Sequence, residues 1–232
     1  MKRVLLKLSG EALAGEKKTG FDEATVIEVA KQIRTIAEEG LEIGIVIGGG
    51  NFWRGRTSET IDRNKADQIG MLATVMNCIY VSDICRYLGL KTEIFTPFVC
   101  GAFTSLYSKD AVEASFAQGK IVFFAGGTGH PYFSTDTATV LRAVEIEAEA
   151  ILLAKAVDGI YDSDPKTNPN AKKYDSVHIQ EVIDQKLAVV DLTASILCME
   201  NKMPMLVFGL NEENSIIRAA KGEIDGTKVL VD

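Results

Sequence analysis

Three glycine- and hydroxyl-rich stretches hold the residues best suited to chemistry, and each follows a short apolar run. The first stretch places Lys7 within such a run and ends in Ser9-Gly10, the second covers residues 48–56, and the third covers residues 126–135. Glycine lets the backbone approach a ligand closely, and successive backbone N–H groups can converge on an anion. A cationic side chain beside those amides would stabilise developing negative charge. The pattern therefore predicts a phosphate cradle with a lysine or a guanidinium beside it.

The second stretch contains three consecutive glycines followed by Asn51, Trp53 and two arginines. Residues 50–57 nearly match the P-loop pattern GxxxxGK[ST], with Arg56 where the lysine belongs. We favour the preceding glycines as the cradle, because Trp53 is bulky for a loop that must wrap a phosphate. Arg54, rather than Arg56, is our candidate for the guanidinium that meets the transferred phosphate. A purely structural glycine turn is the alternative, although three glycines are costly in chain entropy.

Four further candidates each have a simpler structural explanation. Lys7, flanked by buried leucines, would contact a transferred phosphoryl group or only extend its ammonium to a sheet edge. Residues 134–136 would form a helix N-cap or, with Thr128, a polar-ligand site at a helix N-terminus. Asp67 could only complement a helix dipole, and Asp191 could only cap a helix.

Composition narrows the functional class. The chain has 232 residues, 47% of them hydrophobic, and a net charge of −7. This composition is globular, and its charge argues against non-specific binding to nucleic acid or to an anionic membrane. No run is expected to cross a bilayer, and Lys7 interrupts the apolar start, so no signal peptide is expected. These features predict a cytoplasmic protein.

Cysteine and histidine usage limits metal and redox chemistry. The four cysteines contain no CxxC pair, which predicts core thiols in a reducing compartment. Only His130 and His178 are present, too few for a multi-histidine metal site.

Apolar runs and helical patterns alternate along the chain. The predicted strands cover residues 4–8, 43–47, 92–95, 121–125, 151–154, 205–208 and 228–231. The predicted helices cover residues 23–39, 65–88, 109–118, 137–148, 179–185, 191–201 and 215–220, and turn signals over 157–170 predict a hairpin with exposed loops. This alternation predicts an α/β fold, a three-layer αβα sandwich with a mainly parallel central sheet. We expect one domain, 1–232, with lobes of about 1–150 and 151–232.

Two consequences follow for the site. Ligands of such sheets bind at the carboxyl ends of strands, so Ser9-Gly10, residues 48–50 and residues 126–129 should line one crevice. The helix over 65–88 has an apolar stripe that would pack on the sheet or form a subunit interface. The stripe consists of Ile69, Leu72, Met76, Ile79, Ile84 and Tyr87.

Taken together, the motifs resemble the bacterial uridylate kinase family of the amino-acid-kinase superfamily. The matching stretches run in order nearly from end to end: residues 7–13, 48–51, 53–55, 67, 70–77, 128–136, 157–161, 164–165 and 190–192. The resemblance implies an amino-acid-kinase-like fold. It also implies ATP-dependent phosphorylation of UMP to UDP, with Mg²⁺ brought by ATP and no direct protein ligand for the metal. A homohexamer is implied as well, with GTP as activator, through a loose match at residues 16–21, and UTP as inhibitor.

The resemblance also assigns roles to residues. Lys7 and Arg54 would be catalytic, with Asp191 holding the ammonium of Lys7. The residues implied for ATP are Lys7, Leu8, Ser9, Gly10, Gly50, Arg54, Lys155, Tyr161 and Asp164. The residues implied for UMP are Gly49, Asp67, Thr128, Gly129, His130, Pro131, Tyr132, Phe133, Ser134 and Thr135.

Two positions depart from the family pattern. His130 stands where relatives often carry asparagine or serine, which bears on discrimination between UMP and CMP. Lys155 stands where a small polar residue is usual. Two alternatives remain open: another superfamily enzyme such as acetylglutamate kinase, and a nucleotide-binding regulator without catalysis. Asp67 and residues 128–135 suit a nucleotide better than an amino acid, and the presence of Lys7 and Asp191 favours an enzyme.

Overall fold

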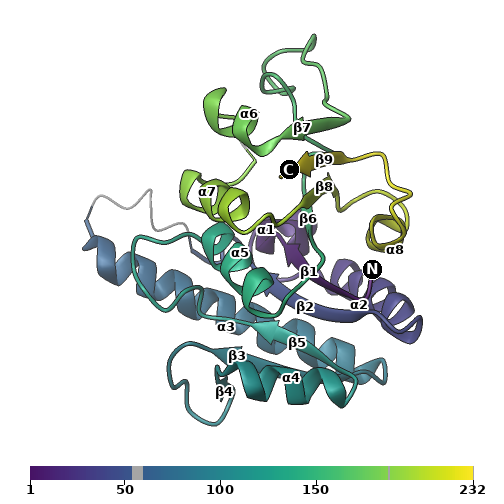
Figure 1. Cartoon of the computed structure of the whole chain (residues 1–232). Helices are drawn as coiled ribbons and strands as arrows, with labels where there is room; N and C mark the ends of the chain where they lie inside the picture. Colours follow the sequence, from purple (N-terminus) through teal and green to yellow (C-terminus); the bar gives the residue numbers. More distant parts are fainter. Residues whose placement is uncertain (54–59, 188, 232) are drawn as a thin grey trace.

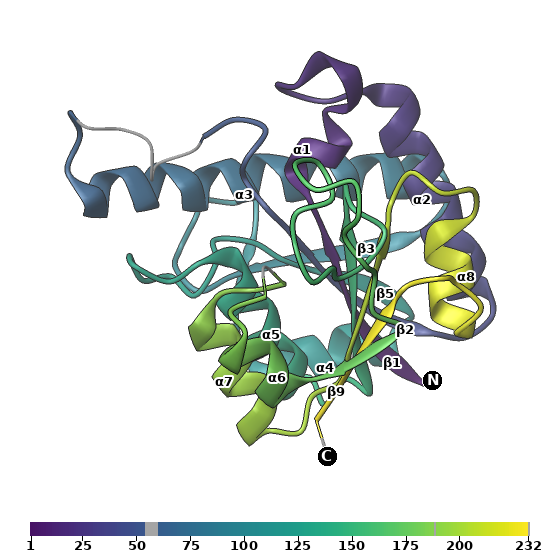
Figure 2. The same cartoon turned by 90° about the horizontal axis from the view of Figure 1, so that it is seen from above.

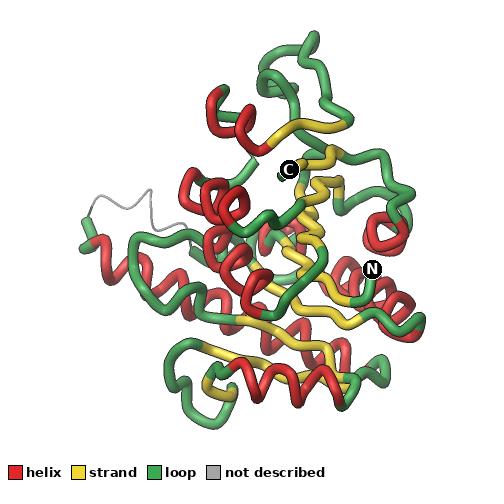
Figure 3. Tube along the Cα trace, in the orientation of Figure 1, coloured by secondary structure: helices red, strands yellow, loops and turns green. Residues whose placement is uncertain are grey.

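The computed structural model describes residues 1–53, 60–187 and 189–231, in which strands and helices alternate along the sequence (Figures 1 and 3). The strands are β1 (Arg3–Leu8), β2 (Glu42–Ile47), β3 (Lys91–Thr96), β4 (Ser105–Leu106), β5 (Lys120–Phe124), β6 (Ala150–Lys155), β7 (Ser176–His178), β8 (Met205–Gly209) and β9 (Thr227–Leu230). The helices are α1 (Gly10–Leu13), α2 (Glu23–Glu38), α3 (Arg63–Tyr87), α4 (Lys109–Ala117), α5 (Thr135–Glu145), α6 (Ile179–Asp184), α7 (Leu192–Glu200) and α8 (Ser215–Lys221), with a 3-10 turn at Gly15–Lys17. The seven predicted strands and seven predicted helices are all present, and the structure adds α1, β4 and β7, which are too short to give a sequence pattern.

The described strands form one sheet in the order β4-β3-β5-β2-β1-β6-β8-β9-β7. Each neighbouring pair is parallel except β8 with β9, which confirms the mainly parallel sheet. Parallel strands are covered by helices on both faces, so their sequences are apolar throughout rather than alternating. Strand β1 illustrates this, because Leu5 and Leu6 point to opposite faces and both are fully buried.

Helices cover the two faces of the sheet and complete the predicted sandwich (Figure 2). One face packs against α2, α3 and α8, with Leu6, Ile45 and Phe123 in the core between the layers. The other face packs against α4, α5, α6 and α7, with Leu5 and Val46 in that core. The three-layer αβα architecture predicted from the sequence is therefore confirmed.

The turn-rich segment after β6 differs from the predicted hairpin. In the described residues its strand pairing is reduced to an isolated antiparallel bridge between Tyr161 and Lys173. Asp164 organises a turn there, since its carboxylate accepts a hydrogen bond from the backbone N–H of Lys166 at 2.9 Å. The segment therefore folds as turns anchored by side chains rather than as two regular strands.

Of the two alternatives considered for the apolar stripe of helix α3, a sheet contact or a subunit interface, the structure excludes the sheet contact for most of the stripe. The buried face instead carries mainly small residues, including Ala73, Cys78 and Ser82. Leu72 and Met76 on the stripe are about half exposed, at 51% and 46%. By length and composition alone α3 could also span a bilayer, contrary to the sequence-based expectation, but a core helix of a soluble protein meets the same criteria. Its small-residue face lets the helix approach the sheet closely and leaves the large apolar side chains outside.

Candidate active site

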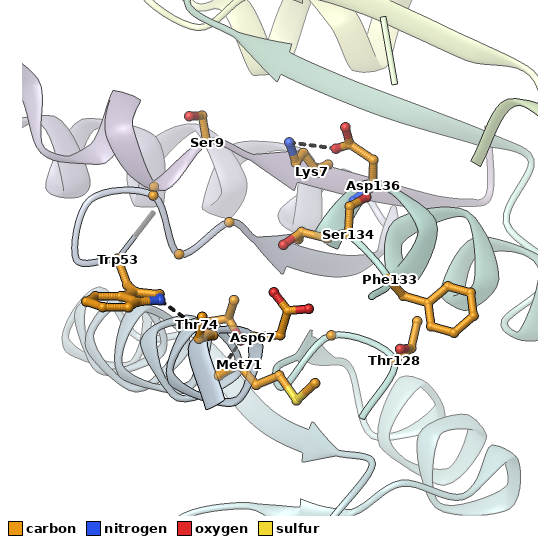
Figure 4. Close-up of a pocket in the computed structure, with 18 of the residues that line it drawn as sticks. Lys7, Ser9, Trp53, Asp67, Met71, Thr74, Thr128, Phe133, Ser134 and Asp136 are labelled. Atoms are coloured by element: carbon orange, nitrogen blue, oxygen red, sulfur yellow. Dashed lines mark hydrogen bonds and ion pairs between the residues drawn. The ribbon is translucent and has the colours of Figure 1, made fainter. Parts of the chain in front are cut away.

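The carboxyl ends of β1, β2 and β5, which are neighbours in the sheet, open into one cavity of about 450 Å³ (Figure 4). This places the three glycine-rich segments together, as expected, because parallel strands bring their carboxyl ends to the same edge. The volume lies in the range of small-molecule sites. The lining residues are Lys7, Ser9, Gly10, Glu11, Gly48, Gly49, Gly50, Trp53, Arg63, Ala66, Asp67, Gly70, Met71, Thr74, Gly127, Thr128, His130, Phe133, Ser134, Thr135 and Asp136.

Lys7 reaches this cavity from the middle of the sheet. Its Nζ lies 3.0 Å from Oδ1 of Asp136, and both side chains are largely buried (Figure 4). Asp136 lies in the first turn of α5, directly after the loop that follows β5. A lysine among buried apolar neighbours needs a charged partner. The partner in the described part of the chain is thus Asp136, and not Asp191 as we expected.

Asp191 lies at the N-cap of α7, where its Oδ1 accepts a hydrogen bond from the backbone N–H of Ala194 at 3.0 Å. It also accepts hydrogen bonds from the hydroxyls of Ser134 and Thr137 on the neighbouring helix α5. Burial alone would raise the pKa of Asp191, but the hydrogen bonds from Ser134, Ala194 and Thr137 outweigh burial and hold the pKa below its ordinary value. Asp191 therefore stays ionised and joins α7 to α5 beside the cavity.

Gly10 and Gly49 at the cavity serve close approach rather than an unusual backbone conformation. A Cβ on Gly10 would lie 2.2 Å from the carbonyl oxygen of Gly48, and a Cβ on Gly49 would lie 3.0 Å from Ala73 on α3. A Cβ on Gly48 would meet no atom closer than 3.8 Å. The three glycines have no positive φ angle among those recorded for the described residues. The backbone of the loop is thus held tightly between α1 and α3.

Asp67 points into the cavity from α3 (Figure 4). Nε of Arg63 donates to both oxygens of Asp67, at 3.0 and 2.8 Å, and the backbone N–H of Tyr132 donates to Oδ2 at 2.8 Å. The guanidinium of Arg63 also lies over the Tyr132 ring, 5.2 Å from its centroid. Asp67 therefore links α3 to the loop between β5 and α5, which is more than the dipole interaction considered from the sequence.

The segment after β5 contributes only part of its expected set to the cavity lining. Thr128, His130, Phe133, Ser134 and Thr135 line the cavity. Gly129, Pro131 and Tyr132 lie on the same segment but outside that lining. Tyr132 has a φ of 71°, which is strained for a residue with a side chain.

Thr74 anchors the same segment to α3. Its hydroxyl accepts a hydrogen bond from the backbone N–H of Gly126 at 2.8 Å and donates to the carbonyl of Met71 at 2.7 Å. Gly126 itself has a φ of 80°, and a Cβ there would lie 2.8 Å from the Phe98 ring. A glycine is therefore required at the point where the strand turns into the loop.

A second cavity, of about 440 Å³, lies beyond β6 and contains Tyr161 in its lining. The Tyr161 hydroxyl donates to Oδ1 of Asp158 at 2.8 Å, and this hydrogen bond raises the pKa of Tyr161. Pro165 and Lys166 also line this cavity, while Asp164 supports them by capping the turn that carries them. The expected ATP contacts are therefore divided between two cavities.

Lys155 ends β6, on the opposite side of β1 from the glycine loop. Its Nζ donates to the carbonyl of Val189, and the residue has a further interaction. Burial lowers the pKa of Lys155, although the charge of Asp136 partly opposes that effect. Lys155 thus places a second cation near the Lys7–Asp136 pair, on the side that faces the C-terminal half of the chain.

Several site residues were missed or could not be placed. Asp136 has the local pattern of a helix start only, although the need of Lys7 for a partner is a usable signal. Arg63 and Thr74 gave no signal, since their contacts depend on tertiary structure. Leu8 is buried in the core rather than in the cavity lining. Arg54 and Arg56 lie outside the described residues.

The acidic lining residues bear on the expected magnesium ion. Among the described residues no group of three or more histidine, cysteine or acidic side chains is arranged to hold a metal. Three carboxylates, those of Glu11, Asp67 and Asp136, nevertheless line the first cavity. Mg²⁺ at phosphate sites is commonly held through one or two carboxylates plus substrate phosphates. The cavity therefore offers carboxylates that fit a magnesium ion entering with ATP, whereas the resemblance implied no direct protein ligand.

Comparison with known proteins agrees with this geometry. The amino acid kinase family model matches residues 2–209. The structure is similar to a UMP kinase from Ureaplasma parvum, with 34% identity, a TM-score of 0.94, and coverage of 99% of this chain and 98% of that chain. It is also similar to a UMP kinase from Bacillus anthracis, with 36% identity, a TM-score of 0.95, and coverage of 100% of this chain and 96% of that chain. A uridylate kinase from Archaeoglobus fulgidus has 28% identity and a TM-score of 0.75, with coverage of 99% of this chain and 100% of that chain. The resemblance to bacterial uridylate kinases is therefore confirmed, and the chain belongs to the amino acid kinase family.

Proposed function

We propose that this chain is a UMP kinase, which transfers the terminal phosphoryl group of ATP directly to UMP and releases UDP and ADP. The observation that carries the proposal is the position of Lys7, whose ammonium enters the 450 Å³ cavity between the glycine loop and Asp136. A phosphoryl transfer between two phosphates needs positioning and charge neutralisation rather than a protein nucleophile. The cavity supplies a cation and closely held backbone at the point where two phosphates would meet.

The UMP site is assigned to the part of the cavity between α3 and the loop after β5. Asp67 would accept hydrogen bonds from the ribose hydroxyls, since a carboxylate has about four lone-pair sites and its present donors leave acceptor capacity. Gly49 and the segment 128–135 would surround the monophosphate and the uracil. His130 lines this region and is the residue through which UMP and CMP would be discriminated.

The ATP site is assigned to the opposite side of the Lys7–Asp136 pair. Ser9, Gly10 and Gly50 line the cavity there and would face the phosphates, together with Lys7 and Arg54. The adenosine would lie in the second cavity, against Tyr161, and Lys155 would lie between the two cavities. Under this assignment, UMP would bind to the lobe of about 1–150 and adenosine to the lobe of about 151–232.

The catalytic step follows from these positions. The UMP phosphate oxygen attacks the terminal phosphorus of ATP in line with the leaving ADP oxygen, and no covalent enzyme intermediate forms. Lys7 neutralises charge that develops on the transferred group, and Asp136 fixes the direction of its ammonium. Asp191, through Ser134 and Thr137, holds the start of α5 and thereby positions Asp136. When bound, Mg²⁺ would neutralise further charge on the ATP phosphates.

The wider biological setting is part of the same proposal. The reaction would serve pyrimidine nucleotide biosynthesis in the cytoplasm, with GTP as activator and UTP as inhibitor. Assembly as a homohexamer is supported by the exposed apolar face of α3, which includes Leu72, Met76 and Ile79. Exposed apolar patches of this kind mark contact surfaces in soluble proteins.

An assay of ADP release with different acceptors tests the proposed function. The purified protein is supplied with ATP and Mg²⁺ and with UMP, CMP or N-acetylglutamate in parallel. We expect ADP release with UMP above that with CMP, and none with N-acetylglutamate. Release with N-acetylglutamate alone would refute a UMP kinase, and no release with any acceptor would favour a nucleotide-binding regulator.

A further inference from the structure

Two buried asparagines, Asn51 and Asn77, lie directly behind the glycine loop and outside the cavity lining. Asn51 follows the three glycines, and Asn77 lies in the middle of α3. Their exposed fractions are 1% and 0%. Buried amides are costly unless each polar group is hydrogen-bonded, so their partners are informative.

The two side chains form a reciprocal pair of hydrogen bonds. Nδ2 of Asn51 donates to Oδ1 of Asn77 at 2.9 Å, and Nδ2 of Asn77 donates to Oδ1 of Asn51 at 2.8 Å. Each amide then has one N–H left. Asn77 donates it to the carbonyl of Gly48 at 2.7 Å, and Asn51 donates it to the carbonyl of Gly20 at 2.8 Å. All four N–H bonds of the pair are therefore used.

The pair consequently joins three segments that are far apart in the sequence. Gly48 begins the glycine loop, Asn77 belongs to α3, and Gly20 lies in the loop before α2. The backbone N–H of Gly20 also donates to the carbonyl of Asn51 at 3.2 Å. Beside it, the Phe21 ring stacks on Tyr80, one helical turn beyond Asn77, with centroids 4.0 Å apart. The loop before α2 is thus fixed to the glycine loop and to α3 at adjacent points.

The pair also sets the space available to α1. A Cβ on Gly10 would lie 2.5 Å from Oδ1 of Asn51 and 3.0 Å from Nδ2 of Asn77. Gly10 and Gly49 both line the cavity. A shift of the amides would therefore move the backbone on both sides of the phosphate-facing region.

We propose that Asn51 and Asn77 are positioning residues, which hold the glycine loop at the distance from α3 and α1 that phosphoryl transfer requires. The inference rests on the proposed UMP kinase function for its catalytic consequence only. The amides lie outside the cavity lining, so they act through the backbone of residues 48–51. A displacement of about 1 Å in such a site can reduce the rate by about 10²-fold, which is the scale expected here.

Asn77→Ala tests the proposal against a matched control on the same helix. Ser82→Ala is the control, because Ser82 is also buried at 1% exposure and shares a hydrogen bond of 2.7 Å with Thr92, away from the glycine loop. Asn77→Ala loses three buried hydrogen bonds and Ser82→Ala loses one, so both variants should lose thermal stability. With the folded fraction matched, we expect Asn77→Ala to lower kcat/KM for UMP by about 10²-fold and Ser82→Ala to leave it unchanged. Equal kcat/KM in the two variants would overturn the proposal.

Two further measurements separate this proposal from the function itself. In a double-mutant cycle, the double variant Asn51→Ala/Asn77→Ala should lower kcat/KM about as much as either single substitution, because the pair acts as a unit. Additive losses in kcat/KM would argue against the pair. Hydrogen–deuterium exchange needs no substrate, and Asn77→Ala should speed exchange at residues 48–52 and 19–21 while Ser82→Ala should not. Unchanged exchange at these residues would refute the positioning role even if the chain phosphorylates UMP. Faster exchange, in a chain that does not phosphorylate UMP, would support the positioning role and refute the proposed UMP kinase function.

Discussion

Lys7 and Asp136 form a largely buried ion pair, with Nζ and Oδ1 3.0 Å apart, at the meeting point of β1 and α5. The pair explains how a lysine can lie in the central strand of a sheet whose neighbouring residues are apolar. It also holds the ammonium within the cavity before any ligand is bound. Since Asp136 is at the start of α5, the direction of Lys7 depends on how that helix is anchored.

The first prediction concerns this ion pair. Lys7→Ala should lower kcat by about 10² to 10³-fold, the range found when one charge-stabilising donor is removed. Asp136→Asn keeps Lys7 but removes the charge that directs it, so kcat should fall by about 10²-fold. Steady-state kinetics of both variants provide the measurement. Near-normal kcat in Lys7→Ala would remove Lys7 from the mechanism, and normal kcat in Asp136→Asn would show that the pair is not needed for turnover.

The second prediction concerns pH and Asp191. Hydrogen bonds hold the pKa of Asp191 in the folded protein below the ordinary value of 3.8. Near that value the unfolded chain therefore binds more protons than the folded chain, so the free energy of unfolding rises with pH. The stabilisation is complete above pH 3.8 and is lost as the pH falls through the lower, folded-state pKa.

Thr137→Val removes one of the hydroxyl donors to Asp191 and should flatten this acid dependence. Thr139→Val is its control, since Thr139 is also buried on α5 but donates to the carbonyl of Thr135 at 2.8 Å. Urea unfolding over a series of acidic pH values measures the difference. If the two variants show the same pH dependence, Thr137 does not contribute to the pKa of Asp191.

The third prediction concerns the four thiols, which the sequence suggested were all in the core. Burial raises the pKa of Cys85 and of Cys198 to about 12, and raises that of Cys78 as well. Cys100 is only half-buried. Because the thiolate is the reactive form, a thiol reagent should label Cys100 first in the native protein. Peptide mapping after brief labelling identifies the site, and modification of Cys85 before Cys100 would contradict the packing described.

The elements of this fold could be predicted because their signals are local. Short apolar runs gave the strands, and capping residues gave helix starts such as Asp22, whose carboxylate accepts a hydrogen bond from the N–H of Thr25 at 2.9 Å. The position of the cavity followed from the parallel sheet and the glycines at three strand ends. These inferences need only neighbouring residues and general rules of sheet topology.

Partners across the fold could not be predicted in the same way. The sequence indicated that Lys7 needs a partner, and the family resemblance suggested Asp191 rather than Asp136. Both aspartates lie at the start of a helix, so the local sequence pattern does not show which of them reaches Lys7. The apolar stripe of α3 could be expected on the sheet or at a subunit interface, because periodicity identifies an apolar face without saying what covers it. The small residues on the other face, such as Ala73, were the signal for close packing on the sheet. The Asn51–Asn77 pair joins positions whose contact depends on the whole arrangement of β2 and α3.

The fourth prediction concerns the two arginines after Trp53, which lie outside the described residues. Trp53 itself lies against α3, since its Nε1 donates to the carbonyl of Ala66 at 2.8 Å. We expect Arg54→Ala to lower kcat by about 10² to 10³-fold, as the loss of one charge-stabilising donor does, and Arg56→Ala to have little effect. Each variant serves as the control for the other in steady-state kinetics. Equal and mild defects in both would count against the assignment of Arg54.

The fifth prediction concerns the exposed face of α3. Ile79 on α3 and Ile196 on α7 are each 39% exposed, so replacing either with glutamate removes a similar amount of buried apolar surface. If the α3 face forms the subunit contact, Ile79→Glu should lower the mass of the assembly, because a charge would be buried without a partner at the interface. Ile196→Glu should leave the mass unchanged.

Light scattering coupled to size-exclusion chromatography measures both masses, with thermal unfolding as a check that each variant is folded. A wild-type mass equal to one chain would refute the homohexamer outright. If the wild type is multimeric and the mass of Ile79→Glu is unchanged, the subunit contact lies on another surface. Since Asn77 lies on the same helix as Ile79, a loss of assembly that also lowers kcat/KM would indicate that the subunit contact supports the position of the glycine loop.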